Sequence, residues 1–392
     1  MMTTKRTAIG RRLAVRRWAN RPPWRGRKLG HGSIVAPFTA TVAATLAATL
    51  AIGVGVALAR AERDRRSTRT RGVRDRQLGL WPGERVADGL RRMALEQLDQ
   101  AIELLEDDGG AVSAAHAVHE TRKSLKRLRA LVRLLEDGTG KRAFAEERAT
   151  LRRAGERLAR ARDAEVMVST LDGLLKRNAG GLARRRGVVK LRGRLVAERD
   201  RAVARALGDA GARQEVLDDL RSVRLRVMGW TLADRAGIKL VEPGLRRLYR
   251  QGRRDYRRAM RGKGERTRTM HQWRKRVKDL RYAAEMLDRA PADPAHGKGP
   301  SDIRRLARRA DELGELLGEE HDLAVLVARL RAPARRGNGQ GLEVGGGTRK
   351  TLLKLIARRR RSLRRKALRR GERLYRPRPK RFVRRVRELS RR

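Results

Sequence analysis

Two related stretches decide the fold of this chain, His119-Glu-Thr-Arg-Lys-Ser-Leu-Lys-Arg-Leu-Arg129 and His271-Gln-Trp-Arg-Lys-Arg-Val-Lys-Asp-Leu-Arg281. In each stretch, basic residues follow the histidine three, four, seven and ten positions later. At 3.6 residues per turn, these five positions fall within an arc of about 120° on one side of a helix. The spacing therefore predicts two long helices, each with a cationic stripe.

The opposite side of each predicted helix is apolar. The two apolar stripes contain Val118, Leu125, Leu128, Val132 and Leu135 in the first helix, and Met270, Val277, Leu280, Ala284 and Leu287 in the second. An apolar stripe at helical spacing indicates a face that packs in a core. From residue 84 onward the chain shows further helical segments separated by Gly and Pro, so we expect a duplicated all-α fold.

The repeated cationic stripe indicates a surface for a polyanion. A single copy is also typical of a solvated surface helix in a basic protein. The repetition, with a histidine in line with the cations each time, favours the binding interpretation. The predicted binding residues are His119, Arg122, Lys123, Lys126, Arg129 and Arg133, then Arg250, Arg253, Arg254 and Arg257 ahead of the second stretch, and His271, Arg274, Lys275, Lys278 and Arg281 within it.

These residues resemble the CHAD domain family, whose name stands for conserved-histidine α-helical domain. The resemblance covers most of residues 84–392. It rests on the two His-x-x-Arg-Lys-x-x-Lys-x-x-Arg stretches, on Leu248-Tyr-Arg-Gln-Gly-Arg-Arg-Asp-Tyr-Arg-Arg258, and on the related pair Leu158-Ala-Arg-Ala-Arg-Asp-Ala-Glu-Val166 and Leu317-Gly-Glu-Glu-His-Asp-Leu-Ala-Val325. It implies two pseudo-symmetric four-helix bundles with a basic channel between them that binds inorganic polyphosphate.

The chain departs from the family pattern in two places. His321 precedes Asp322 where family members often have a small polar residue, and Arg133 of the first stretch is matched by Glu285 in the second. Many relatives also carry a catalytic domain of the CYTH type, recognised by a Glu-x-Glu-x-Lys motif. This chain has no such motif, so the resemblance does not imply triphosphate hydrolysis.

Composition supports a polyanion partner independently of the family. The 392 residues include 100 Lys and Arg against 44 Asp and Glu, which gives a net charge of +56. Such a charge makes the compact state repel itself, and an anionic partner relieves the repulsion. The absence of cysteine excludes disulfides, iron–sulfur clusters and thiol catalysis. Five Trp, four Tyr and three Phe are few for a base-stacking platform.

Residues 1–83 differ from the rest of the chain. Arginines flank the stretch from Leu29 to Ala59, which carries no charge and exceeds the ~20 residues that cross a bilayer. We predict a basic arm with a membrane anchor at about 34–59, and a poorly ordered arm is the alternative. A CHAD-like domain would follow at 84–392, with halves at about 84–210 and 211–392. We expect this domain in the cytoplasm, at an anionic lipid surface or on polyphosphate granules.

The histidines and two acids have predicted roles in the site. His119 and His271 are expected to begin their helices, where free backbone amides and the helix dipole also attract an anion. Asp163 and Asp322 are expected to orient a neighbouring arginine or histidine, or to cap a helix. A histidine that only braces the bundle remains an alternative. The histidines lack companions for a metal site or for catalysis, so we predict no metal, cofactor, catalytic residue or small-molecule substrate.

Nucleic acid is the alternative partner, because a sugar-phosphate backbone attracts the same cations as polyphosphate. The position of the cations distinguishes the two partners. A narrow channel accepts a single flexible phosphate chain and excludes a duplex, whereas an outer stripe of cations favours DNA or RNA.

Overall fold

A computed structural model describes most of the chain beyond the basic arm. The described residues are 78–107, 110–139, 144–178, 181–207, 210–232, 234–262, 265–289, 302–333, 342 and 344–389. They belong to one compact unit, residues 71–392. The predicted anchor at 34–59 lies outside them. Among the helices that are described, none combines the length and the apolar composition that a bilayer crossing requires.

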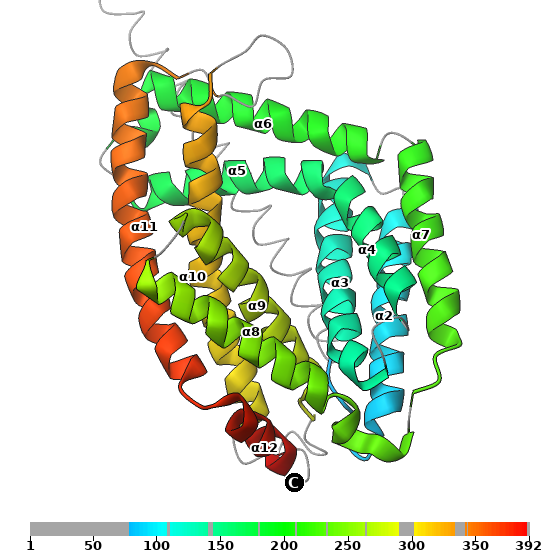
Figure 1. The fold of residues 1–392 in the computed structure, drawn as a ribbon. Coiled ribbons are helices and arrows are strands. Elements are labelled where there is room, and N and C mark those ends of the chain that lie inside the picture. Colours follow the sequence, from blue (N-terminus) through cyan, green and yellow to red (C-terminus); the bar gives the residue numbers. More distant parts are fainter. Residues whose placement is uncertain are drawn as a thin grey trace, which may run out of the picture. The chain divides into compact units, whose positions relative to one another are not determined.

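The described elements are helical, so this part of the chain is all-α (Figure 1). A single β-bridge joins Leu80 to Arg289. The helices are α2 (Val86–Glu106), α3 (Gly110–Thr139), α4 (Ala145–Arg157), α5 (Ala159–Lys176), α6 (Arg186–Leu207), α7 (Ala210–Met228), α8 (Glu242–Arg261), α9 (Arg266–Leu287), α10 (Asp302–Arg331), α11 (Gly346–Tyr375) and α12 (Pro379–Leu389), with 3₁₀ helices η2 (Leu182–Arg184) and η3 (Asp234–Leu240).

Helix packing repeats along the sequence. Helix α2 packs against α3 and α7, and α8 packs likewise against α9 and α12. Helices α5 and α6 form a pair that lie side by side, as do α10 and α11 (Figure 1). Equivalent helices also meet each other, because α3 contacts α9 and α5 contacts α10. The repeat in the sequence therefore corresponds to a repeat in helix packing.

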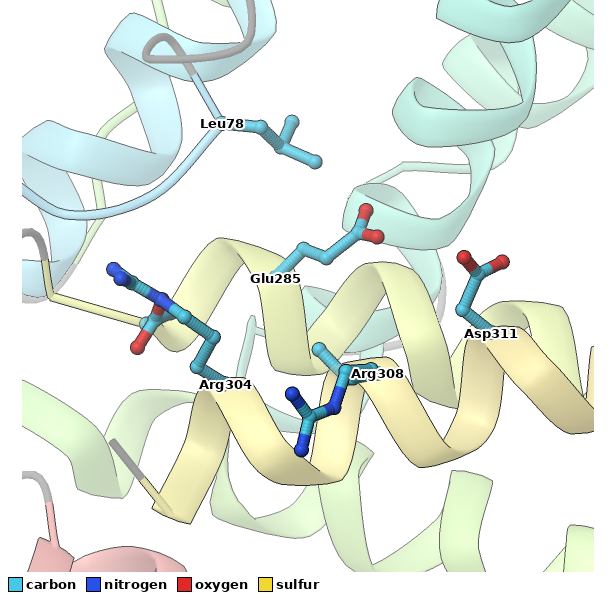
Figure 2. Close-up of a pocket in the computed structure, with 7 residues that line it drawn as sticks. Leu78, Glu285, Arg304, Arg308 and Asp311 are labelled. Carbon is cyan, nitrogen blue, oxygen red and sulfur yellow. The ribbon is translucent and has the colours of Figure 1, made fainter. Parts of the chain in front are cut away.

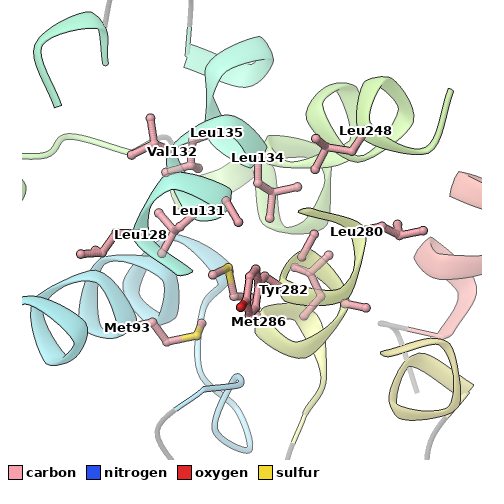
Figure 3. Close-up of a cluster of buried hydrophobic side chains, with 14 of the residues drawn as sticks. Met93, Leu128, Leu131, Val132, Leu134, Leu135, Leu248, Leu280, Tyr282 and Met286 are labelled. Atoms are coloured by element: carbon pink, nitrogen blue, oxygen red, sulfur yellow. The ribbon is translucent and has the colours of Figure 1, made fainter. Parts of the chain in front are cut away.

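The buried side chains form two clusters, and both clusters combine the two halves of the sequence. The larger cluster joins α2, α3, α4 and α7 to α8, α9, α12, the first part of α10 and the last part of α11. Figure 3 shows Leu131 and Leu134 of α3 in this cluster, with Met286 of α9 and Leu248 of α8. The smaller cluster joins α5 and α6 to the other parts of α10 and α11. The two halves of the described chain therefore do not each have a core of their own.

Helix length explains this grouping. Helices α10 and α11 have 30 residues each, whereas α8 and α9 have 20 and 22. At 1.5 Å per residue, the longer helices extend about 45 Å and pass beyond their shorter neighbours. Their apolar residues beyond that point need another partner, and α5 and α6 provide it.

Two boundaries differ from the sequence-based expectation. Residues 78–83 pack in the compact unit instead of belonging to the arm, since Leu80 is buried and its amide donates to the carbonyl oxygen of Asp288 at 2.9 Å. Helix α7, placed in the second half, packs against α2 and α4. Helix α10 is continuous from Asp302 to Arg331.

Two glycines allow helices to approach closely. A Cβ atom on Gly244 of α8 would overlap the carbonyl group of Leu134, so the backbones of α8 and α3 are in direct contact there. A Cβ atom on Gly371 of α11 would lie 2.5 Å from the indole ring of Trp273. Both contacts require the absence of a side chain.

Candidate functional site

The cationic side of α9 lies against α10. Arg274 Nη2 is 3.9 Å from Asp322 Oδ1. The guanidinium also lies beside Gly318, where a Cβ atom would be 3.6 Å from Nη2. A methyl group at Gly318 would make only ordinary van der Waals contact with Arg274, and Asp322 lies beside the guanidinium, in the position expected of an orienting acid.

His271 of α9 contacts His321 of α10. Their Nδ1 atoms are 3.1 Å apart, and the ring centroids are 4.1 Å apart. One Nδ1 must carry a proton and donate it to the other, which fixes opposite tautomers in the two rings. The repeated stripes do not predict a role for His321 in the site. Its signal was the departure from the family pattern beside Asp322.

Both histidines are neutral at neutral pH. Burial, followed by the charges of Lys275 and Arg274, lowers the pKa of His271 to about 4. Burial and the neighbouring His271, Arg274, Lys275 and Arg360 lower the pKa of His321 to about 3. The pair therefore supplies hydrogen-bonding groups at neutral pH and gains charge only in acid.

The histidines do not begin their helices. Helix α3 starts nine residues before His119, and α9 starts five residues before His271. Backbone amides this far from the start of a helix donate hydrogen bonds to carbonyl groups four residues earlier, so they are not available to an anion. The predicted contribution of free amides and of the helix dipole is therefore wrong.

Two lysines of α9 lie in a strongly cationic environment. Lys278 is half-buried, and it forms no ion pair with the described residues. Burial, followed by the charge of Arg274, lowers its pKa to about 8. The pKa of Lys275 is also lowered, by burial and then by Arg129 and Arg133 of α3. The structure thus brings cations of both repeated helices within electrostatic range of one another.

Arg133 has a structural partner on the other repeated helix. Its Nη1 donates to both carboxylate oxygens of the buried Asp279, at 2.8 and 2.9 Å. Burial raises the pKa of Asp279, and the charges of Arg133 and Arg276 oppose that shift. Burial and the charge of Arg133 lower the pKa of the neighbouring Arg129. Arg133 therefore holds α3 to α9, and Arg129 lies within electrostatic range of Lys275.

The remaining cations of α3 make local contacts. Arg122 Nη1 donates to the carbonyl oxygen of Gly155 in α4 at 2.8 Å. Lys123 Nζ lies 3.3 Å from Glu120, and His119 Nε2 lies 3.7 Å from the same carboxylate. Lys126 and His119 are exposed. The first repeated helix therefore lacks a histidine pair like that of the second.

Asp163 does not reproduce the role of Asp322. It is exposed and forms no ion pair with any residue that the structure describes. The preceding position is occupied by arginine, where the second half has His321. The two halves thus share a framework but differ in the acid and its neighbour.

Arg281 is already engaged by acids. Its Nε donates to Glu285 at 2.6 Å, and its Nη1 pairs with Asp311. Figure 2 shows Glu285 and Asp311 beside a cavity of about 260 Å³ that Arg304 and Arg308 also line. Acids and bases both line this cavity. Glu285 and Asp311 pair with Arg281, although the charge of Arg281 still helps to lower the pKa of Lys278.

The four predicted arginines of α8 lie on another surface. Arg250, Arg254 and Arg257 are exposed, and Arg253 Nε donates to the carbonyl oxygen of Tyr375 at 3.0 Å. They line a cavity of about 320 Å³. The structure therefore does not bring these arginines together with the histidine pair.

Helix α11 supplies a cation that the sequence analysis did not assign individually. Arg360 Nε donates to Glu320 at 3.0 Å, its Nη2 donates to Thr267 at 2.9 Å, and its charge helps to lower the pKa of His321. Arg360 belongs to a run of four arginines that surrounds the helix. Periodicity alone could not show which of the four faces α9 and α10.

The described residues contain no group of three or more His, Cys, Asp or Glu side chains placed to hold a metal ion. Comparison with protein families finds that the model described as CHAD domain matches residues 92–331, more than half of the chain. Comparison with curated proteins finds no match.

Proposed function

The chain belongs to the CHAD family, which is associated with polyphosphate binding, and from this premise we propose that it binds inorganic polyphosphate. One observation carries the proposal. Cations of α3 and α9 come together at Arg129, Arg133 and Lys275, and the half-buried Lys278 beside them forms no ion pair with the described residues. We define the motif-helix site as Arg129, His271, Arg274, Lys275, Lys278 and His321.

A polyanion stabilises this arrangement. Burial, and after it the charges of neighbouring cations, lower the pKa values of Lys275 and Lys278, so these cations repel one another at a partly buried surface. Arginine donates two parallel hydrogen bonds to phosphate oxygens, and lysine adds a mobile charge. In the neutral histidine pair one N–H is used between the two rings, so one Nε2–H, on the ring whose Nδ1 accepts, is left to donate to a phosphate. Asp322 orients Arg274, and Lys123 and the exposed Lys126 of α3 extend the surface.

The proposal includes the pseudo-symmetric bundles and the basic channel implied by the family. Helix α8 packs against α9 and α12 in the way that α2 packs against α3 and α7, and this repeat supports the symmetry. The contact of α3 with α9 supports a surface shared by both halves. We propose that the protein binds polyphosphate without catalysing a reaction. Asp163 and Asp322 then have no catalytic role.

Competition binding tests the function. Labelled long-chain polyphosphate on the full chain is challenged with unlabelled polyphosphate, duplex DNA and single-stranded RNA at equal phosphate concentration and near-physiological salt. We expect polyphosphate to compete best. Equal competition by DNA or RNA would instead support the nucleic-acid alternative.

Charge reversal tests the site. We expect Arg274→Glu/Lys278→Glu to weaken polyphosphate binding by more than about tenfold, because attraction becomes repulsion at the centre of the surface. Arg201→Glu/Arg205→Glu on α6 is the matched control, with the same spacing and charge change on exposed residues. Equal losses in both variants would show that only net charge matters.

The proposal places the binding domain in the cytoplasm, tethered by the segment at about 34–59 and able to associate with anionic lipid or polyphosphate granules. Deletion of residues 1–60 should release the protein from membranes in a sedimentation assay, because the uncharged stretch is lost. Full-length protein that stays in the supernatant without detergent would contradict the anchor.

A further inference from the structure

The outer side of α11 carries a continuous stripe of cations. We define the α11 stripe as the exposed residues Lys350, Lys354, Arg358, Arg361, Arg365, Arg369 and Arg373. They recur every three or four residues, which places them within an arc of about 140° over a length of about 35 Å. The buried residues of α11, such as Leu352, Ile356 and Leu363, lie on the opposite side. Figure 1 shows α11 along one edge of the fold, so the stripe faces away from the rest of the described chain.

The acids near α11 leave the stripe without partners. They pair instead with other arginines of the helix, namely Arg359 with Glu319, Arg360 and Arg364 with Glu320, and Arg370 with Glu312. No stripe residue forms an ion pair or hydrogen bond with any residue that the structure describes. The helix itself contains one acid, Glu372. Because neighbouring cations on one side of a helix repel, an anion from outside the chain stabilises this surface.

The stripe is separate from the motif-helix site. Arg360 reaches that site from α11, because its charge helps to lower the pKa of His321. It lies about 150° around the helix from the middle of the stripe. The part of the chain that matches the CHAD family also ends at residue 331, before α11 begins at Gly346. A ligand on the α11 stripe therefore contacts residues outside both the motif-helix site and the matched part of the chain.

We propose that the α11 stripe binds the backbone of duplex DNA without sequence preference. An outer stripe can meet a rigid double helix, which a narrow channel excludes. The major groove is about 12 Å wide and admits an α-helix, whose diameter with side chains is about 10–12 Å. The stripe is about as long as one turn of the duplex, roughly 35 Å, and its breadth directs cations to the phosphates of both strands. This binding goes beyond the polyphosphate binding proposed above and does not depend on it.

Other anionic partners fit the stripe less well. Tyr375 is the one aromatic residue of α11 and is buried, so the stripe offers no surface on which single-stranded bases stack. The apolar side of α11 is buried in the core, so the helix cannot lay that side into a bilayer. Duplex RNA has a deep, narrow major groove that side chains cannot read. Duplex DNA is therefore the partner that this surface favours.

Fluorescence anisotropy of a labelled DNA duplex of about 24 base pairs, roughly two turns, titrated with the full chain tests this site. The variant Arg361→Gln/Arg365→Gln/Arg369→Gln removes three stripe cations, and glutamine preserves helix propensity. We expect its Kd for DNA to rise by about tenfold or more, and the slope of log affinity against log salt to fall by about 2–3. The matched control Lys190→Gln/Arg201→Gln/Arg205→Gln removes three exposed cations of α6, and its Kd should stay within about twofold of the unmodified chain.

Further measurements separate this site from the polyphosphate site. The variant Arg274→Glu/Lys278→Glu should retain DNA binding, and the α11 triple variant should retain binding of long-chain polyphosphate. If the α11 triple variant is unstable by circular dichroism, Arg365→Gln alone provides the test, with a rise in Kd of about two- to threefold.

Several outcomes would overturn the DNA site. They are equal losses in the α11 and α6 triple variants, equal affinity for single-stranded DNA or duplex RNA, and loss of DNA binding in Arg274→Glu/Lys278→Glu. Vesicles of phosphatidylglycerol are the remaining probe. If the unmodified chain binds these vesicles through the stripe and does not bind DNA, the partner is a lipid surface and the proposal is wrong. The polyphosphate titrations are scored separately from all of these outcomes.

Discussion

At the scale of single residues, the contact between His271 and His321 makes the second repeated helix different from the first. His119, the counterpart of His271, is exposed and lies near Glu120. Burial and surrounding cations keep the His271–His321 pair neutral in the folded protein. In the unfolded chain, a histidine titrates near its ordinary value of about 6.5. Below that pH the unfolded state binds more protons, so the folded state loses stability.

Replacing His321 tests this pH dependence. We expect the free energy of unfolding to fall between pH 7.5 and 5, and His321→Asn to remove about 1–2 kcal/mol of that fall. The exposed His119→Asn serves as the control and should leave the pH dependence intact. Urea unfolding at both pH values measures the effect. An unchanged pH dependence in His321→Asn would show that the pair is not the titrating element.

At the scale of helices, close packing of backbones determines how α8 lies on α3. Gly244 of α8 faces the carbonyl group of Leu134, and a methyl group there would overlap it. The larger core cluster surrounds this crossing, with Leu131 and Leu135 of α3 and Leu248 of α8 buried nearby (Figure 3). Movement of α8 would therefore disturb side chains contributed by both halves of the sequence.

Substitution of Gly244 tests the importance of this crossing. We expect Gly244→Ala to lower the free energy of unfolding by about 1–3 kcal/mol, because the overlap forces the helices apart. Gly193→Ala in α6 is the control, since no atom lies within 4 Å of its added methyl group. There alanine should stabilise by about 0.5–1 kcal/mol through helix propensity. Chemical denaturation distinguishes these opposite signs, and stabilisation by both substitutions would contradict the close crossing.

At the scale of the whole molecule, charge repulsion opposes the compact state. The chain carries a net charge of +56, and many of its acids are already paired with arginines, as in Arg133–Asp279 and Arg364–Glu320. Acids of the described residues therefore leave the motif-helix site and the α11 stripe with excess positive charge. A bound polyanion should stabilise the folded state by mass action.

Polyphosphate should therefore raise the melting temperature, and added salt should reduce that rise. Each phosphate contact releases counterions, so the logarithm of the binding constant should fall linearly with the logarithm of salt concentration. Differential scanning fluorimetry and titrations at several salt concentrations measure the two effects. Sodium sulfate at equal ionic strength is the control for general salt effects. A rise in melting temperature that is insensitive to salt would argue against phosphate contacts.

The sequence by itself determined the all-α class, the duplication, and most helix positions. Hydrophobic periodicity, Gly and Pro are local signals, so the two repeated stretches form the long helices α3 and α9, as predicted. The cationic stripes were also predictable, because the faces of a helix follow from its period. The proposed anchor depends on residues outside the described part, and it stays a prediction.

Only the tertiary structure decided which distant residues meet. It grouped the buried side chains into two cores shared by both halves, paired His271 with His321, and joined Arg133 to Asp279. It also separated the predicted arginines of α8 from the motif-helix site. Helical periodicity determines the side of a helix on which a residue lies. It does not determine which other helix packs against that side. The neighbour depends on helix lengths and on close approaches such as that at Gly244, which are properties of the packed molecule.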